Sequence, residues 1–124
     1  MNPARILVVD DDPAMLRTVE RVLAPHHVVA SAEGGEAALR QAASFAPELV
    51  ILDVHMPRMD GFELLNRLRD AHPELDAIFM TGVVHELDEP LVRSIRERAF
   101  YFIQKPFERE LLLPLVERCL ELRR

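Results

Sequence analysis

The sequence has little of what builds disulfide-stabilised or membrane-inserted proteins. Its 124 residues include one cysteine, no tryptophan and no apolar run near the ~20 residues that cross a bilayer. The single thiol, Cys119, cannot form an internal disulfide, which favours a reducing cytoplasm, and its apolar helical surroundings predict a core residue rather than a nucleophile. After residues 1–5, only four apolar residues precede an acidic triplet, which argues against a signal peptide. We therefore expect one cytoplasmic domain over residues 1–124.

Positive charge is scarce and comes almost entirely from one residue type. The net charge of −6 argues against direct binding of nucleic acid by this chain. Of the 15 cationic residues, 14 are arginine, and Lys105 is the one lysine. Because arginine is a planar fork and lysine a compact point charge, the two are not interchangeable at a tight anion site. Position 105 is therefore a candidate anion-binding position.

Apolar runs and turn residues alternate along the whole chain. We predict strands over 5–10, 27–31, 49–53, 77–81 and 100–104, and helices over 13–24, 36–45, 62–72, 90–98 and 108–122. Five alternations of strand and helix require a parallel sheet with helices on both faces. The predicted fold is a single α/β domain, a (βα)5 doubly wound parallel sheet with the flavodoxin-like strand order 2-1-3-4-5. The strand over 27–31 has the weakest pattern, so we expect it near an edge.

The segment over 49–53 is the centre of this organisation. Four apolar residues, two of them β-branched, indicate a strand buried on both faces, and Asp53 stands where that strand ends. A carboxylate at this place needs a charged or hydrogen-bonded partner. Asp53 could instead be a turn or helix-capping residue, but Pro57 and Gly61 intervene before the next helical pattern. We favour a site carboxylate, since central parallel strands hold ligands at their carboxyl ends.

The predicted strand order brings four strand ends together at one edge of the sheet. These ends carry Asp10 and Asp11, Asp53, Thr81 and Lys105. Three carboxylates and one ammonium leave an excess of negative charge, which makes each carboxylate harder to ionise. A divalent cation would neutralise the excess, and oxygen ligands favour Mg²⁺ over Zn²⁺. The sequence therefore predicts a magnesium site here.

The same side chains suit the chemistry of a phosphoryl group. A carboxylate nucleophile can form an acyl phosphate, while a metal ion and a lysine hold the equatorial oxygens and a threonine hydroxyl donates to one more.

Four segments at these strand ends resemble the receiver domain of two-component response regulators, over essentially the full length of the chain. They are residues 6–13, 52–64, 80–82 and 105–107, and residues 35–39 also resemble the second helix of that family. Each match is weak alone, but four in this order at strand ends are very specific. The resemblance implies a phosphorylation-controlled signalling switch, which catalyses only its own phosphorylation and dephosphorylation and is not otherwise an enzyme.

The resemblance also implies a role for each site residue. Asp53 would accept a phosphoryl group from a sensor histidine kinase, a phosphotransfer protein or a small phosphodonor. Asp11 and Asp53 would bind Mg²⁺ together with the backbone carbonyl of His55, and Asp10 would act through water.

The remaining implied roles concern transmission of the signal. Thr81 and Lys105 would bind phosphoryl oxygens, Phe102 rather than Tyr101 would be the aromatic switch residue, and the bond from Lys105 to Pro106 would be cis. The face made by the fourth helix, the fifth strand and the last helix would contact a downstream effector or output domain, or form a homodimer on phosphorylation. The chain would be a stand-alone receiver or part of a longer regulator or hybrid kinase.

The chain departs from the family pattern between the fourth and fifth strands. A Gly-Ala pair that often precedes the fifth strand reads Arg98-Ala99 here, and the stretch from Thr81 to Lys105 is slightly long. The fourth helix is therefore the least transferable part. Pro114 would cost about 3 kcal/mol inside a regular helix, so we expect a kink over 110–114 or a helix that starts late.

No chemical role is predicted for the following histidine and methionine side chains. Exposed turns are predicted for His26, His27, His72 and His85. Core filling or loop anchoring is predicted for Met15, Met56, Met59 and Met80.

Two alternatives remain open. One is a degenerate receiver that binds partners without phosphorylation, although every site residue type is present. The other is a phosphatase of the haloacid dehalogenase type, whose opening motif resembles Asp10-x-Asp12. That class needs a larger chain with a cap and would leave Asp53 unexplained.

Overall fold

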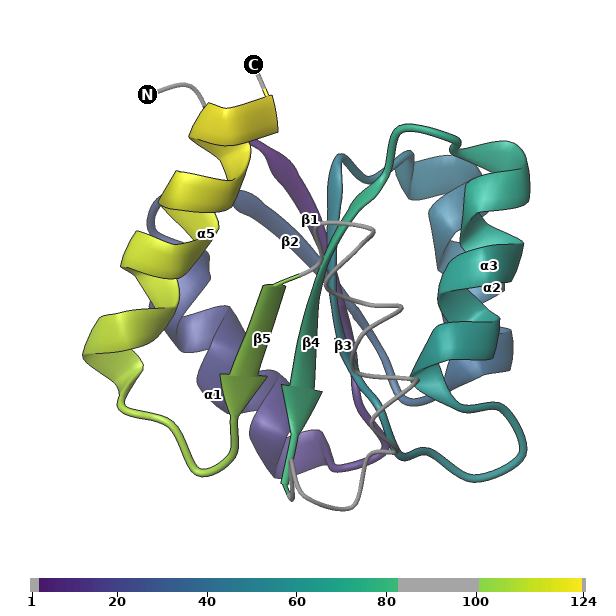
Figure 1. Ribbon diagram of the computed structural model, residues 1–124, viewed down its shortest axis with the longest axis horizontal. Helices are drawn as coiled ribbons and strands as arrows, with labels where there is room; N and C mark the ends of the chain where they lie inside the picture. The colour runs from purple at the N-terminus through teal and green to yellow at the C-terminus, as the bar shows by residue number, and fades with distance from the viewer. Residues whose placement is uncertain (1–2, 83–100, 124) are drawn as a thin grey trace.

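The computed structural model describes residues 3–82 and 101–123 and contains a five-stranded parallel sheet between two layers of helices (Figure 1). Its elements in chain order are β1 (Arg5–Val9), α1 (Pro13–Leu23), β2 (Val28–Ala32), α2 (Gly35–Phe45), β3 (Leu49–Asp53), α3 (Gly61–Ala71), β4 (Asp76–Thr81), β5 (Tyr101–Gln104) and α5 (Arg109–Arg123). The helix predicted over 90–98, the pair Arg98-Ala99, His85 and the predicted strand start at Phe100 lie outside the described residues.

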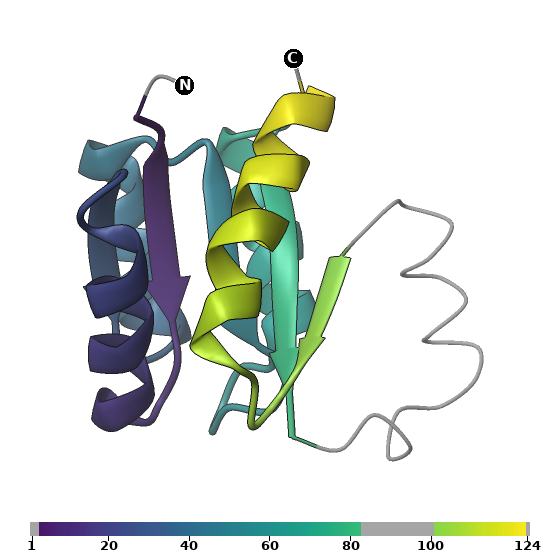
Figure 2. The same cartoon turned by 90° about the vertical axis from the view of Figure 1, so that its left-hand side faces the viewer.

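The strand order is β2-β1-β3-β4-β5, which confirms the predicted order, and every neighbouring pair is parallel. The weakly patterned β2 lies at one edge, as expected. Helices α1 and α5 cover one face of the sheet, and α2 and α3 cover the other (Figure 1). Turned by 90°, the molecule shows α1 and α5 side by side on the near face (Figure 2). Among the described residues, no helix combines the length and apolar character that a bilayer crossing needs.

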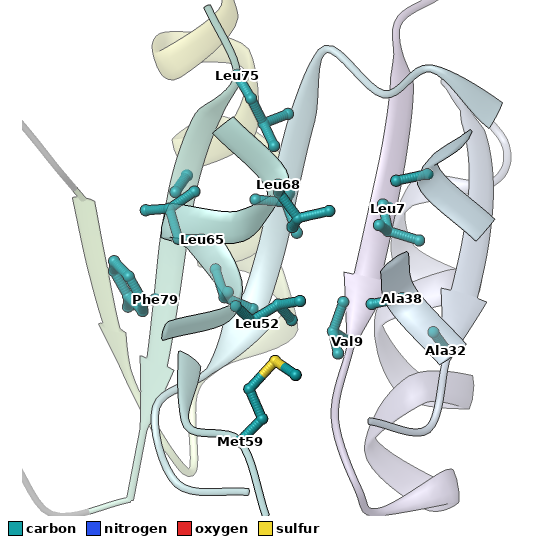
Figure 3. Close-up of a cluster of buried hydrophobic side chains, with 14 of the residues drawn as sticks. Leu7, Val9, Ala32, Ala38, Leu52, Met59, Leu65, Leu68, Leu75 and Phe79 are labelled. Atoms are coloured by element: carbon teal, nitrogen blue, oxygen red, sulfur yellow. The ribbon is translucent and has the colours of Figure 1, made fainter. Parts of the chain in front are cut away.

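Alternate residues of each strand fill two separate cores. Leu7 and Val9 on β1 point to the α2–α3 face, whereas Ile6 and Val8 point to the α1–α5 face. All five residues of β3 are buried, as expected for a central parallel strand. Figure 3 shows the core of the α2–α3 face, with side chains from β1, β3 and β4 meeting those of the two helices. Cys119 is buried in the other core, as predicted.

The helix ends follow from local side chains. Asp12 caps α1, because its carboxylate accepts a hydrogen bond from the N–H of Ala14 (2.9 Å), and Pro13 occupies the first turn. Helix α5 begins at Arg109 and continues through Pro114, so the alternative of a late start is wrong, while the kink stays a prediction.

The prediction of an exposed turn for His27 is wrong. The residue is 6 % exposed and lies just before β2. Its Nδ1 accepts a hydrogen bond from the N–H of Ala4 (3.0 Å), so the ring proton belongs on Nε2, which lies 3.2 Å from a carboxylate oxygen of Glu117 on α5. The ring is buried because Ala4, just before β1, and Glu117 on α5 both supply partners. His26 is exposed as predicted, and His72 is half-buried at the end of α3.

Candidate functional site

Asp53 ends β3 and is nearly enclosed, with 9 % of its side chain exposed. Its Oδ1 accepts a long hydrogen bond from the N–H of His55 (3.3 Å). The capping alternative for Asp53 is wrong, because α3 is capped by Asp60, whose carboxylate accepts from the N–H of Glu63 (2.9 Å). The carboxylate of Asp53 is therefore not used to start a helix.

The three carboxylates that follow β1, those of Asp10, Asp11 and Asp12, lie in three different environments. Asp10 is fully buried, Asp11 is exposed, and Asp12 caps α1. The Oδ1 of Asp10 accepts a hydrogen bond from the N–H of Asp12 (3.0 Å). This turn holds the Asp10 carboxylate at the carboxyl edge of the sheet, where the arrowheads of β4 and β5 also end (Figure 1).

Lys105 follows β5 and bridges two of the carboxylates. Its Nζ lies 2.7 Å from the Oδ2 of Asp10 and 3.3 Å from the Oδ2 of Asp53. The backbone N–H of Lys105 donates to the carbonyl of Thr81 (2.8 Å), which ties the end of β5 to the end of β4. The bond between Lys105 and Pro106 is cis, as predicted. The one lysine of the chain thus lies inside the cluster rather than on the surface.

Burial and charge act in opposite directions on this pair. Burial raises the pKa of the Asp10 carboxyl above its ordinary value, although hydrogen bonds from Lys105 and from the backbone of Asp12 oppose the rise. Burial lowers the pKa of the Lys105 ammonium, but hydrogen bonding and attraction from Asp10, with a further contribution from Asp53, outweigh it and leave that pKa raised. Lys105 is therefore a firmly charged ammonium.

The donor set fits a hard divalent cation. Asp10, Asp11 and Asp53 each offer a carboxylate oxygen, and these oxygens lie within 4.8 Å of one another. One ammonium does not balance three carboxylates, so a cation would find uncompensated charge here. Carboxylate oxygens suit Mg²⁺ in particular. The acidic cluster could therefore bind a metal ion.

Thr81 ends β4 and contacts Lys105 through its carbonyl, and Phe102 lies in β5, three residues before that lysine. The hydroxyl of Thr81 is buried and makes no hydrogen bond to any of the residues described. It can therefore donate to, or accept from, a group that binds at this strand end. Phe102 is half-buried, and its ring packs at 5.7 Å between centroids against Phe79. All five residues predicted at the strand ends thus meet at one edge of the sheet.

Gly61 contributes to the site in a way that the sequence did not reveal. A methyl group on Gly61 would press into the carbonyl oxygen of Asp53 and lie 3.2 Å from the Cα of Val54. Only glycine lets the start of α3 come this close to the end of β3. The signal available in the sequence was the position of Gly61 directly after a capping aspartate.

Comparison with known proteins gives a consistent result. The model of the response regulator receiver domain family matches residues 6–117. The chain is 35 % identical to the nitrogen assimilation regulatory protein NtrX of Azorhizobium caulinodans, covering 94 % of this chain and 26 % of that protein. It is 34 % identical to the DNA-binding transcriptional regulator NtrC of Escherichia coli, covering 97 % and 25 % of the two chains. The chain thus spans about a quarter of the length of the curated relatives it matches.

Among solved structures, the signal receiver domain of an HD domain-containing protein from Pseudomonas fluorescens superposes with a TM-score of 0.84. The sequences are 31 % identical, and the match covers 99 % of this chain and 98 % of that one. With the family model, the relatives and the fold in agreement, the chain belongs to the receiver domains of two-component response regulators, a family of signalling domains that depend on phosphorylation.

Proposed function

We propose that residues 1–124 form one receiver domain in which Asp53 accepts a phosphoryl group from a histidine kinase, a phosphotransfer protein or a small phosphodonor. The observation that carries this proposal is the position of Lys105, whose ammonium contacts Asp10 and Asp53 at once. An ammonium so placed can receive an oxygen of an incoming phosphoryl group without leaving the cluster.

The chemistry follows from the side chains at the carboxyl edge. An oxygen of the Asp53 carboxylate attacks phosphorus as the bond from phosphorus to the donor's leaving atom breaks, which leaves an acyl phosphate on Asp53. The ammonium of Lys105 holds one phosphoryl oxygen, and the buried hydroxyl of Thr81 donates to another. Hydrolysis of that acyl phosphate by water returns the starting carboxylate.

We assign the metal to Asp11, Asp53 and the backbone carbonyl of His55, with Asp10 acting through water. Bound Mg²⁺ would neutralise charge that develops on the phosphoryl oxygens. The facing carboxylates of Asp10, Asp11 and Asp53 support this assignment, because they leave negative charge that one ammonium does not balance.

Thr81 and Phe102 are the proposed switch. Movement of the Thr81 hydroxyl toward a phosphoryl oxygen would free space near β5, and the half-buried ring of Phe102 would move inward. The affected face would comprise β5, α5 and the helix predicted over 90–98, which lies outside the described residues. We propose that this face controls an output domain or a downstream effector in the cytoplasm, or pairs with a second copy after phosphorylation.

The experiment is phosphorylation by acetyl phosphate, followed by intact-mass measurement. Wild type should gain the mass of one phosphoryl group only with Mg²⁺ present, and Asp53→Asn should gain none. Asp60→Asn is the matched control, because Asp60 lies in the same loop but caps α3 and keeps the label. A wild type that is never labelled would instead favour a receiver that works without phosphorylation. Turnover of a phosphomonoester that persists in Asp53→Asn would favour the phosphatase.

A further inference from the structure

The loop between β3 and α3 is a closed unit. The N–H of Gly61 donates to the carbonyl of Val54 (2.9 Å), so the two ends of the loop are fastened together. Between these ends, four side chains are exposed, namely His55, Pro57, Arg58 and Asp60. Met59 differs from them, with 6 % of the residue exposed. Met56 is half-buried against the same core, so Met59 is the most deeply buried side chain in the outer part of this loop.

Met59 packs against the start of α2. A methyl group on Gly35 would lie 2.7 Å from the Sδ of Met59 and 3.1 Å from its Cβ, so a side chain at position 35 would have to displace Met59 from this contact. Figure 3 shows the Met59 side chain reaching from the loop toward Val9, Leu52 and Ala38. Because Gly35 and Met59 belong to different βα units, the contact joins α2 to the loop that follows Asp53.

The backbone next to Met59 is held away from its relaxed conformation. Arg58 has a φ of 71°, in the left-handed region that non-glycine residues avoid. Such a conformation persists only where the surroundings impose it. The N–H of Met59 donates to the carbonyl of Pro57 (2.8 Å) across Arg58, so the turn that holds this φ ends at the buried Met59.

The same loop orients Asp53. The backbone N–H of His55, in this loop, donates to the Oδ1 of Asp53. Gly61, at the end of the loop, lies against the backbone carbonyl of Asp53. A relaxed loop would therefore move both the carboxylate and the His55 carbonyl by the small distances to which catalysis and metal binding are sensitive.

We infer that Met59 is a positioning residue for the carboxylate site, and that it acts through its contact with Gly35. The inference rests on the proposed function for its effect on phosphorylation, but not for its effect on metal binding. Met59 and Gly35 line an open cleft of about 540 Å³ between the loop and α2. Because Met59 lines this cleft, we expect Met59→Ala to enlarge the cleft and to fold at a cost in stability.

The first test needs neither metal nor phosphate and uses urea unfolding of the whole chain in chelator. Gly35→Ala should lower the urea midpoint in wild type, because the new methyl group meets Met59. In the Met59→Ala background the same change should raise the midpoint, since alanine favours a helix more than glycine does. A change of the same sign in both backgrounds would overturn the contact.

The second test measures Mg²⁺ binding by amide chemical shifts and labelling by acetyl phosphate. Met59→Ala should raise the half-saturating Mg²⁺ concentration about tenfold, the low end of what loss of an outer-shell partner costs. Labelling at limiting Mg²⁺ should slow about as much. Met59→Leu, which conserves volume, should stay within about twofold of wild type. Val29→Ala, in the half-buried amino-terminal part of β2, controls for lost stability and should change neither quantity.

The outcomes separate the two ideas. If wild type is labelled and Met59→Ala matches it in metal binding and rate, the inference fails and the proposed function stands. If wild type binds Mg²⁺ but is never labelled, the proposed function fails, and weaker binding by Met59→Ala still supports the inference. If wild type does not bind Mg²⁺, both fail.

Discussion

Removal of the ammonium from the carboxylate cluster should destabilise the fold strongly, and most strongly near neutral pH. The variant is Lys105→Met, which keeps the length of the side chain and removes its charge. The Oδ2 of Asp10 then loses its ion-pair partner, which lies 2.7 Å away in the native chain. Asp10 has no exposed surface, so water cannot replace that partner. Breaking a buried ion pair by removing one partner costs about 3–5 kcal/mol. We take about 3 kcal/mol, because 19 % of the Lys105 side chain is exposed.

The pH dependence follows from the raised pKa of Asp10. For a carboxyl with a raised folded-state pKa, its contribution to stability is present below the unfolded value of 3.8 and is lost as pH rises through the folded value. Without Lys105 that folded pKa rises further, so the variant loses more stability as pH approaches neutrality. The raised pKa of Lys105 contributes the same stability at both ends of this window, because that contribution is lost only as pH rises above its ordinary value of 10.5.

The assay is urea unfolding in chelator at about pH 7.5 and about pH 5. Asp10→Asn in the Lys105→Met background should recover about 2 kcal/mol at the higher pH, because no buried charge is left unpaired. Arg67→Met is the control, since the exposed pair of Arg67 with Glu63 is worth less than about 1 kcal/mol. A cost below about 1 kcal/mol for Lys105→Met, or an equal cost at both pH values, would refute the reasoning.

Four further changes test other parts of the structure. Gly61→Ala should cost about 1–3 kcal/mol in urea unfolding, since the new methyl group meets the backbone of Asp53; a neutral result would contradict the close approach. His27→Ala should cost about 2 kcal/mol and speed exchange of the Ala4 amide, because that buried N–H loses its acceptor; unchanged exchange would count against it. Pro114→Ala should raise the free energy of unfolding by about 1 kcal/mol by restoring a helical hydrogen bond, and no gain would mean that α5 already accommodates the ring. Asp11→Ala should melt higher than wild type in chelator, because like charges are relieved, and should gain nothing from added Mg²⁺; a wild-type response to Mg²⁺ would remove Asp11 from the metal site.

The sheet and its order could be predicted because they depend on local patterns. Apolar runs such as the one ending at Asp53 are long enough to be strands and too short to be helices, and the helical segments between them force parallel pairing. Because parallel strands end at the same edge of the sheet, the polar residues that follow them lie close together there. Asp10, Thr81 and Lys105 come together for that reason alone, before any side-chain geometry is known.

The features that the sequence did not reveal depend on partners far away in the chain. His27 is buried because Glu117, 90 residues later, reaches its ring from α5. Its local sequence, after a proline and beside a second histidine, is that of a surface turn. Core filling or loop anchoring was predicted for Met59, but its contact with Gly35 joins two βα units and depends on their tertiary packing. Burial of one particular side chain is therefore a tertiary property, and local patterns do not fix it.

The buried polar cluster lowers the stability of a domain of this size, and this cost supports a functional interpretation. A small domain is stable by only about 5–15 kcal/mol, and a buried ion pair is often no better than apolar residues of the same volume. Asp10 is fully buried, and burial raises its pKa, so ionising it opposes folding. The hydroxyl of Thr81 is also buried with its hydrogen-bonding capacity unused among the described residues. Packing alone would favour apolar side chains at both positions. Polar groups kept there, around one ammonium, are best explained by charge that arrives at this edge from outside the chain.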